Sequence, residues 1–383
     1  MTMFARIQAF LYRHRRKFII SGILIGSAVL ASRYAQKKLR EWQEKETKEF
    51  LERTRRQHHF ESTERTCNQT ILSLIPTIRE AVIKILDTED LVIRLRSDPP
   101  DKLSLWEELK IKAFTRASVL VYAGAMLVVA LRIQLNLIGG YMYQDSTSET
   151  DEGARAPHIS STLQHNYLSL CHHFVNEGIH ELCSLVEEKV HLIVEGTSLK
   201  QQLNLQDTEQ LFWAIQAAVT GDLRDPIKCL ARYILPPDHP ATADCDTLQK
   251  MVSETMDLLE SDEVLSLTSS CVSQGFSLMV DRISDYYGPA ANKAALNVNA
   301  GTSGLQNKTQ IPNSGLGHSN GLATFVHPNN VAMPMAKLIP IVNGLVQHQI
   351  GHGGGPDLWI QQLILNEKLK LLGANVYEAF SNK

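Results

Sequence analysis

The sequence has little that would indicate a disulfide framework, a nucleotide site or a sheet. Its six cysteines are scattered over 383 residues without CxxC spacing. A chain of this length does not need disulfides for stability, so we expect reduced cysteines in a protein that faces the cytosol. No Walker A loop is present, and no G-x-G-x-x-G follows a predicted strand, so we expect no cofactor. Regular strand patterns and fixed-period repeats are also missing, which leaves an all-α fold as the prediction.

The charges are divided unevenly along the chain. Residues 1–60 hold 14 of the 38 Lys/Arg and 5 of the 41 Asp/Glu, which leaves 24 basic and 36 acidic residues for the remainder. The first part is therefore basic by 9 charges and the rest is acidic by 12. Because the basic clusters flank an apolar run, they indicate anionic lipid and not nucleic acid as the partner.

That apolar run, Phe18 to Ser32, predicts a transmembrane anchor behind a short basic N-terminus, residues 1–17. At 1.5 Å per residue the run covers only about 22 Å of a roughly 30 Å hydrocarbon layer. Lys17 and Arg33 can extend outward and close most of the gap. A cleaved signal peptide or a buried helix is the alternative. The orientation of this segment across the membrane is left open, because the residues on both of its flanks are basic.

A second apolar run, Ala117 to Leu131, has the same length as the first. Hydropathy alone does not separate the two. Gln134 and Asn136 follow it among further apolar residues, which is typical of a helix inside a bundle. We predict a core helix here and therefore a single membrane span.

Helical periodicity organises the rest of the chain. The charged stretch 34–57 predicts a solvated helix, and residues 62–88 carry an apolar stripe. Pro99 and Pro100 break the chain before a long helical pattern over 102–143. Further helical patterns cover 162–195, 199–220, 246–260, 262–286, 335–346 and 358–380. Residues 144–160 predict a polar loop, and the Asn- and Gly-rich segment 288–332 predicts a disordered insertion.

Two fragments hint at enzyme chemistry. Residues 352–355 (HGGG) and 317–321 (GHSNG) resemble the oxyanion-hole and nucleophile motifs of lipases, with Ser319 as nucleophile. A nucleophile elbow requires a strand before the serine and a helix after it, and neither is predicted. His173, Glu177 and His180 have metal-ligand spacing on a helix, but such faces are common without metal. We expect no enzyme and no metal; a membrane-bound serine hydrolase is the remote alternative.

A binding surface is a better candidate than a reactive site. After Pro100, the side chains of Leu103, Trp106 and Leu120 share one helix face, which Lys102 and Lys110 border. A Trp near the start of a helix is either a core anchor or a hot spot for an incoming amphipathic helix. Periodicity alone favours the core.

Several blocks together resemble the peroxin-3 family, the peroxisomal membrane receptors that dock peroxin-19. They are, in order, the basic-flanked anchor with YAQKKLREWQE (34–44), RRQHHFESTERTCN (55–68), LSLWEELKIKAFTR (103–116), LRIQLNLIGGYMY (131–143), KLIPIVNG (337–344) and ANVYEAFS (374–381). The resemblance covers essentially the whole chain. It is weaker over residues 144–330.

The resemblance implies an elongated multi-helix bundle, residues 33–383, that faces the cytosol behind a single transmembrane helix in the peroxisomal membrane. It implies a groove for an amphipathic helix of peroxin-19. Because peroxin-19 carries newly made membrane proteins, these cargo proteins would contact this chain only indirectly. It places that helix on Trp106, with Leu95, Lys102, Leu103, Leu109 and Lys110 as surrounding contacts. The resemblance therefore favours Trp106 as a binding residue, whereas periodicity alone favoured it as a core residue. A membrane tether or organelle adaptor is an alternative or additional role.

Overall fold

The computed structural model describes residues 15–148, 159–237, 245–287, 331–347 and 358–382. The chain divides into two compact units, residues 1–61 and residues 62–383, which we treat separately. Most of the predicted insertion 288–332 and both lipase-like fragments lie outside the described residues. So does most of the predicted loop 144–160.

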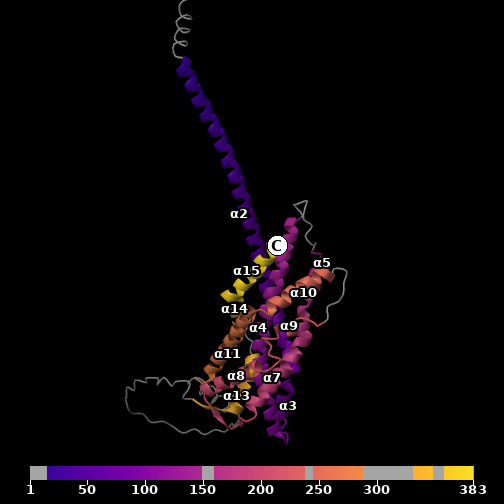
Figure 1. The fold of residues 1–383 in the computed structure, drawn as a ribbon. Helices are drawn as coiled ribbons and strands as arrows, with labels where there is room; N and C mark the ends of the chain where they lie inside the picture. Colours follow the sequence, from indigo (N-terminus) through magenta and orange to yellow (C-terminus); the bar gives the residue numbers. More distant parts are fainter. Residues whose placement is uncertain (1–14, 149–158, 238–244, 288–330, 348–357, 383) are drawn as a thin grey trace, which may run out of the picture. The chain divides into compact units, whose positions relative to one another are not determined.

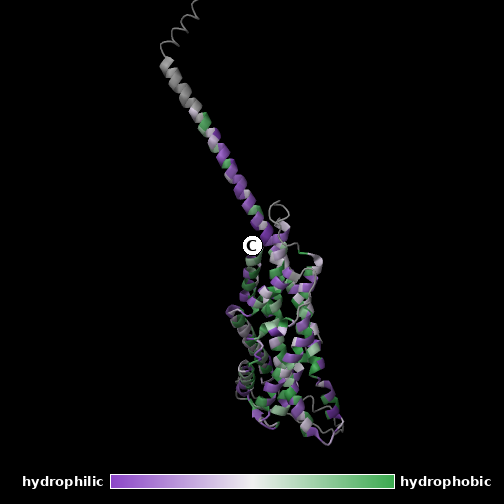
Figure 2. Ribbon diagram, turned by 45° about the vertical axis from the view of Figure 1, so that its right-hand side comes forward, coloured by the Kyte–Doolittle hydropathy of each residue, from purple (hydrophilic) through white to green (hydrophobic). Residues whose placement is uncertain are grey.

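Unit 1 contains the first part of α2 (Arg15–Ile85). Residues 18–32 are therefore helical, but most of their side chains lie outside the described set. Residues 29–55 are exposed throughout, and Figure 2 shows that hydrophilic residues predominate along this stretch. The second compact unit begins at Ser62.

The described residues of unit 2 are almost entirely helical, which confirms the predicted all-α class (Figure 1). After α2 its elements are α3 (Glu89–Arg96), α4 (Lys102–Ser148), α5 (Ser161–Ser169), α6 (Cys171–His173), the π-helical turn η1 (Phe174–Gly178), α7 (Ile179–Val194), α8 (Leu205–Thr220), α9 (Leu230–Ile234), α10 (Cys245–Leu259), α11 (Asp262–Ser284), η2 (Asp285–Tyr287), α13 (Met335–Gln347), α14 (Leu358–Leu365) and α15 (Glu367–Ser381). The two short strands β1 (Gln202–Leu203) and β2 (Met333–Pro334) pair antiparallel.

Helix α4 is the central element of unit 2 and lies against α7, α10, α11, α13 and α15. Among the described residues, Lys102–Thr147 is the one helix that is long and apolar enough to cross a membrane. However, 94% of its most apolar window is buried inside the protein. The segment 117–131 is thus a core helix, as predicted.

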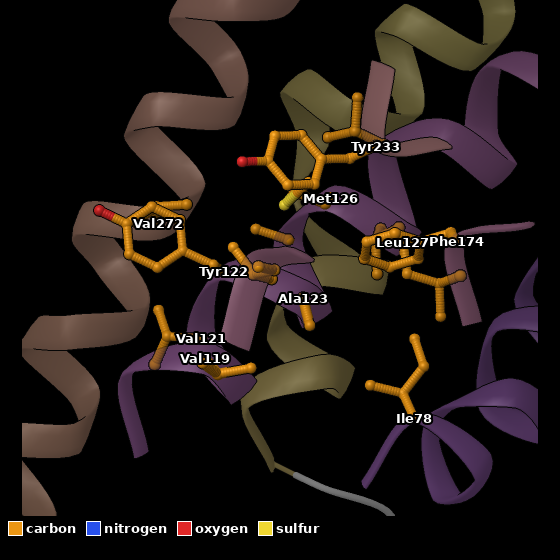
Figure 3. Packing of buried hydrophobic residues seen from close by; sticks show 14 of the residues in the cluster. Ile78, Val119, Val121, Tyr122, Ala123, Met126, Leu127, Phe174, Tyr233 and Val272 are labelled. Atoms are coloured by element: carbon orange, nitrogen blue, oxygen red, sulfur yellow. The ribbon is translucent and has the colours of Figure 1, made fainter. Parts of the chain in front are cut away.

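The core forms where side chains from α4 meet those of its neighbours. Tyr122 and Met126 of α4 converge with Val272 of α11 and Tyr233 of α9 (Figure 3). Each of these four side chains is fully buried. Excluding this much apolar surface from water is the main stabilising contribution to unit 2.

Three predicted boundaries are wrong, each because of local polar contacts. Helix α4 continues to Ser148, into the predicted loop 144–160. There the hydroxyls of Ser146 and Thr147 donate to the Tyr143 carbonyl at 2.7 and 3.2 Å. The predicted helix 199–220 starts only at Leu205, because Asn204 forms a capping box with Asp207.

The predicted helix 358–380 is divided in two at Asn366. The Asn366 side chain accepts hydrogen bonds from the backbone N–H groups of Lys368 and Leu369. It thereby caps α15 at its start. A short helix, α9, was not predicted at all.

The described cysteines are free, as expected for a reduced protein. Cys67, Cys171, Cys183 and Cys271 are buried, whereas Cys229 is half-buried. Burial raises the pKa of Cys67 and of Cys271 to about 11. These thiols are therefore protonated and unreactive at neutral pH.

Candidate partner-binding surface

The turn between α3 and α4 determines where the predicted contact residues lie. After α3 ends at Arg96, the Ser97 hydroxyl donates to the Arg94 carbonyl at 2.7 Å. Asp98 then has φ 58°, a left-handed conformation that Asp tolerates better than most residues. Pro99 and Pro100 follow, and Lys102 begins α4 with an ion pair to Asp98. The predicted break at the two prolines is confirmed.

Four of the six predicted contact residues are wholly or partly accessible. Leu103 is 69% exposed, and the Lys102 side chain is 53% exposed. Trp106 and Leu95 are half-buried, and both pack against the hydrophobic core. Because α3 and α4 contact each other, we call these four residues the α3–α4 surface. Ile93, which the sequence did not single out, is also exposed on α3.

Leu109 and Lys110 lie inside the bundle, and this corrects the expectation that Lys110 borders an exposed face. The Lys110 side chain is fully buried. Its ammonium donates to the Thr197 carbonyl at 2.8 Å and pairs with Glu107 at 2.5 Å. Helical periodicity indicates on which face of the helix a side chain lies, but not whether that side chain is buried. Within two turns of Lys102, α4 has entered the bundle.

The start of α3 is fixed by Asp87. Its carboxylate accepts the backbone N–H of Glu89 at 2.9 Å and that of Asp90 at 3.3 Å. The hydrogen bond from Asp90, together with that from Glu89, lowers the pKa of Asp87. Lys112 of α4 donates to the Asp87 carbonyl at 3.4 Å. Helix α3 is thereby both capped and tied to α4.

Sequence reasoning missed the buried polar residues behind this surface. Thr88 and Arg116 are fully buried, and Asn343 is 7% exposed. A signal was present for Arg116, because this charged residue directly precedes the apolar run 117–131. Nothing local in the sequence points to its partners.

The comparison with known families decides what kind of protein carries this surface. The family model described as Peroxin-3 matches residues 9–99 and 96–379. The chain belongs to the peroxin-3 family. Peroxisomal biogenesis factor 3 of Mus musculus is 36% identical over 389 residues, which cover 97% of this chain and 96% of the relative.

Other relatives of this peroxin-3 chain give the same result. Peroxisomal biogenesis factor 3 of Homo sapiens is 35% identical over 399 residues, 99% of this chain and 98% of the relative. Peroxisomal membrane protein PEX3 of Komagataella phaffii is 25% identical over 254 residues, 52% of this chain and 56% of the relative. The peroxin-3 family consists of peroxisomal biogenesis factors and is not enzymatic.

Membership of the peroxin-3 family removes the support for the hydrolase alternative, whose Ser319 and His352 lie outside the described residues. The structure also describes His173, Glu177 and His180, for which we expected no metal despite their spacing. Nδ1 of His173 lies 3.7 Å from a carboxylate oxygen of Glu177, and the π-helical turn η1 separates His173 from His180. No group of three or more potential ligands occurs in the part of the chain that the structure describes.

Proposed function

We propose that this chain is a docking receptor that binds cargo-loaded peroxin-19 through the α3–α4 surface. Its role in peroxisome biogenesis follows from the family. The observation that supports the finer proposal is the exposed Leu103 one turn before the half-buried Trp106. A partly buried aromatic side chain next to an exposed leucine is the arrangement that receives an amphipathic helix.

The six predicted contact residues have three different roles in this proposal. Leu103, Trp106 and Leu95 would contact the apolar face of the peroxin-19 helix, which removes their outer surface from water. Lys102 would meet an acidic group at the rim and contribute little, because it stays solvated. Leu109 and Lys110 would support the surface from behind without touching the partner.

We further propose that residues 18–32 span the peroxisomal membrane once, with the bulk of the chain in the cytosol. The basic-flanked apolar run supports this, as does the burial of the other apolar helix, Lys102–Thr147. Docked cargo is then released beside its target bilayer without covalent chemistry or nucleic acid. Protease treatment of intact peroxisomes should digest the bundle and spare the N-terminus; protection of the bundle would contradict this topology.

The docking proposal is tested by Trp106→Ala in the full chain, reconstituted in lipid nanodiscs. Calorimetric titration with peroxin-19 should show binding that is at least about 30-fold weaker, which corresponds to a loss of about 2 kcal/mol or more. Trp213→Ala is the matched control, because Trp213 is 73% exposed on α8. It should bind with unchanged affinity.

Circular dichroism should show that both variants remain helical. If Trp106→Ala binds peroxin-19 as tightly as the unchanged chain does, the α3–α4 surface is not the docking site.

A further inference from the structure

A buried arginine joins three helices behind the α3–α4 surface. Arg116 of α4 is fully buried. Its Nη1 donates to the Thr88 hydroxyl, and to Asn343 Oδ1 of α13 at 3.1 Å. Both Nη atoms lie 3.3 Å from carboxylate oxygens of Glu89, the first residue of α3. The guanidinium thus connects α4 with α13 and with the N-terminus of α3.

These contacts constrain geometry more than a single ion pair would. A buried guanidinium is costly unless it is paired and hydrogen-bonded; these partners bond both Nη atoms of Arg116, although its Nε has no partner. Arg116 therefore favours the arrangement in which all three partners converge. Its contact with both carboxylate oxygens of Glu89 also fixes how the Glu89 carboxylate is oriented relative to the guanidinium. Thr88 donates in turn to Asn343 at 3.1 Å, which closes the network.

Helix α3 needs such a constraint because it is short. It has eight residues, and Leu91 is its one fully buried residue. A helix of this length is not stable alone in water. Leu95 lies six residues after Glu89, about 9 Å along the axis, so a small rotation at the N-terminus displaces it.

We propose that Arg116 is a positioning residue for partner docking. By holding the N-terminus of α3 against α4 and α13, it keeps Leu95 in place on the α3–α4 surface. This inference rests on the proposed function, since it concerns the surface that receives peroxin-19. Arg116 itself does not touch the partner.

Arg132 provides a matched control on the same helix. It is equally buried, and its Nη2 donates to Asn68 Oδ1 at 2.7 Å and to the Ile364 carbonyl at 3.0 Å. It lies sixteen residues further along α4, about 24 Å away. Arg132 therefore joins α4 to α2 and α14, away from the α3–α4 surface.

The experiment measures peroxin-19 affinity by calorimetry for the full chain in nanodiscs. Arg116→Met should weaken binding by about tenfold, as expected if the surface is correctly formed in about a tenth of the molecules. Glu89→Ala, at a side chain that is 43% exposed, should weaken binding in the same direction and threatens folding less. Arg132→Met should bind within about twofold of the unchanged chain while it stays folded.

A second measurement separates positioning from general stability. If Arg116 acts through the surface, then in a Trp106→Ala background Arg116→Met should weaken binding by less than about twofold. Hydrogen exchange in α3 should also be faster in Arg116→Met than in Arg132→Met.

Full affinity of both Arg116→Met and Glu89→Ala, with Trp106→Ala still impaired, would overturn this inference and leave the proposed function intact. Equal weakening by Arg132→Met would also overturn it, because the effect would then be general. If the unchanged chain does not bind peroxin-19, the proposed function fails and this inference fails with it.

Discussion

Two lysines near the start of α4 have different surroundings, because one lies at the surface and the other is buried in the bundle. Lys102 is half-exposed and pairs with Asp98 at the helix start. Lys110, eight residues later, is fully buried between Glu107 and the Thr197 carbonyl. The first charge is available to a partner, whereas the second ties α4 to the turn that follows α7.

Removing the buried lysine should therefore lower stability much more than removing the exposed one. Lys110→Ala should lower the free energy of unfolding by about 2 kcal/mol, because it leaves the buried Thr197 carbonyl unpaired and opens a cavity. Lys102→Ala should change that free energy by less than about 0.5 kcal/mol. Urea unfolding followed by circular dichroism measures both. Equal stabilities would contradict the structural role of Lys110.

Helix α3 has a cap that comes from the residue before the usual cap position. The Asp87 carboxylate accepts two backbone N–H groups at the start of α3. Thr88, the residue in the cap position, makes no side-chain cap hydrogen bond because its hydroxyl faces Arg116. Asp87 consequently carries the capping role, and its charge strengthens the two bonds.

This cap should make the contribution of Asp87 to stability depend on pH. Because the folded state lowers the pKa of Asp87, its stabilising effect is complete above the unfolded pKa, about 3.9. The effect is lost as the pH falls through the lower, folded pKa. At pH 7, Asp87→Ala should therefore cost about 1 kcal/mol. The difference in urea-unfolding free energy should shrink below pH 4; a constant difference would contradict the cap.

Periodicity in the sequence was sufficient to predict most of the longer helices and many of their buried faces. The apolar stripe of 62–88, with Ile71, Ile78 and Val82 in the core, is an example. Helix ends were harder, because side chains such as Ser146 and Asn366 decide them by bonding to the backbone. The burial of Leu109 and Lys110, two of the six proposed contact residues, did not follow from periodicity. Arg116 and Asn343 are 227 residues apart in sequence, so no local pattern connects them.

At the scale of the whole of unit 2, the C-terminal helix closes the core against α4. Tyr141 of α4 stacks on Phe380 of α15 with ring centroids 5.6 Å apart. The two helices approach closely where Gly373 faces Asn136 and where Gly140 faces Phe380. Helix α15 thus contributes residues up to Phe380 to a core that also includes Cys67 of α2.

Gly140 tests whether this close approach limits stability. An added Cβ would lie 2.8 Å from Phe380 Cβ and 3.0 Å from the Tyr377 carbonyl oxygen, so α15 would have to move. Alanine favours a helix over glycine by about 1 kcal/mol, but overpacking against backbone costs about 1–3 kcal/mol. We expect the steric cost to exceed the helix preference, so that Gly140→Ala lowers the melting temperature by about 2–4 °C.

Gly196→Ala is the control, since an added Cβ there meets nothing within 4 Å and its φ is outside the left-handed region. Its melting temperature should match that of the unchanged chain, because a surface substitution without new contacts changes stability by less than about 0.5 kcal/mol. Calorimetric melting of the full chain compares the two variants. If Gly140→Ala raised the melting temperature, helix preference would dominate and α15 would be free to shift on α4.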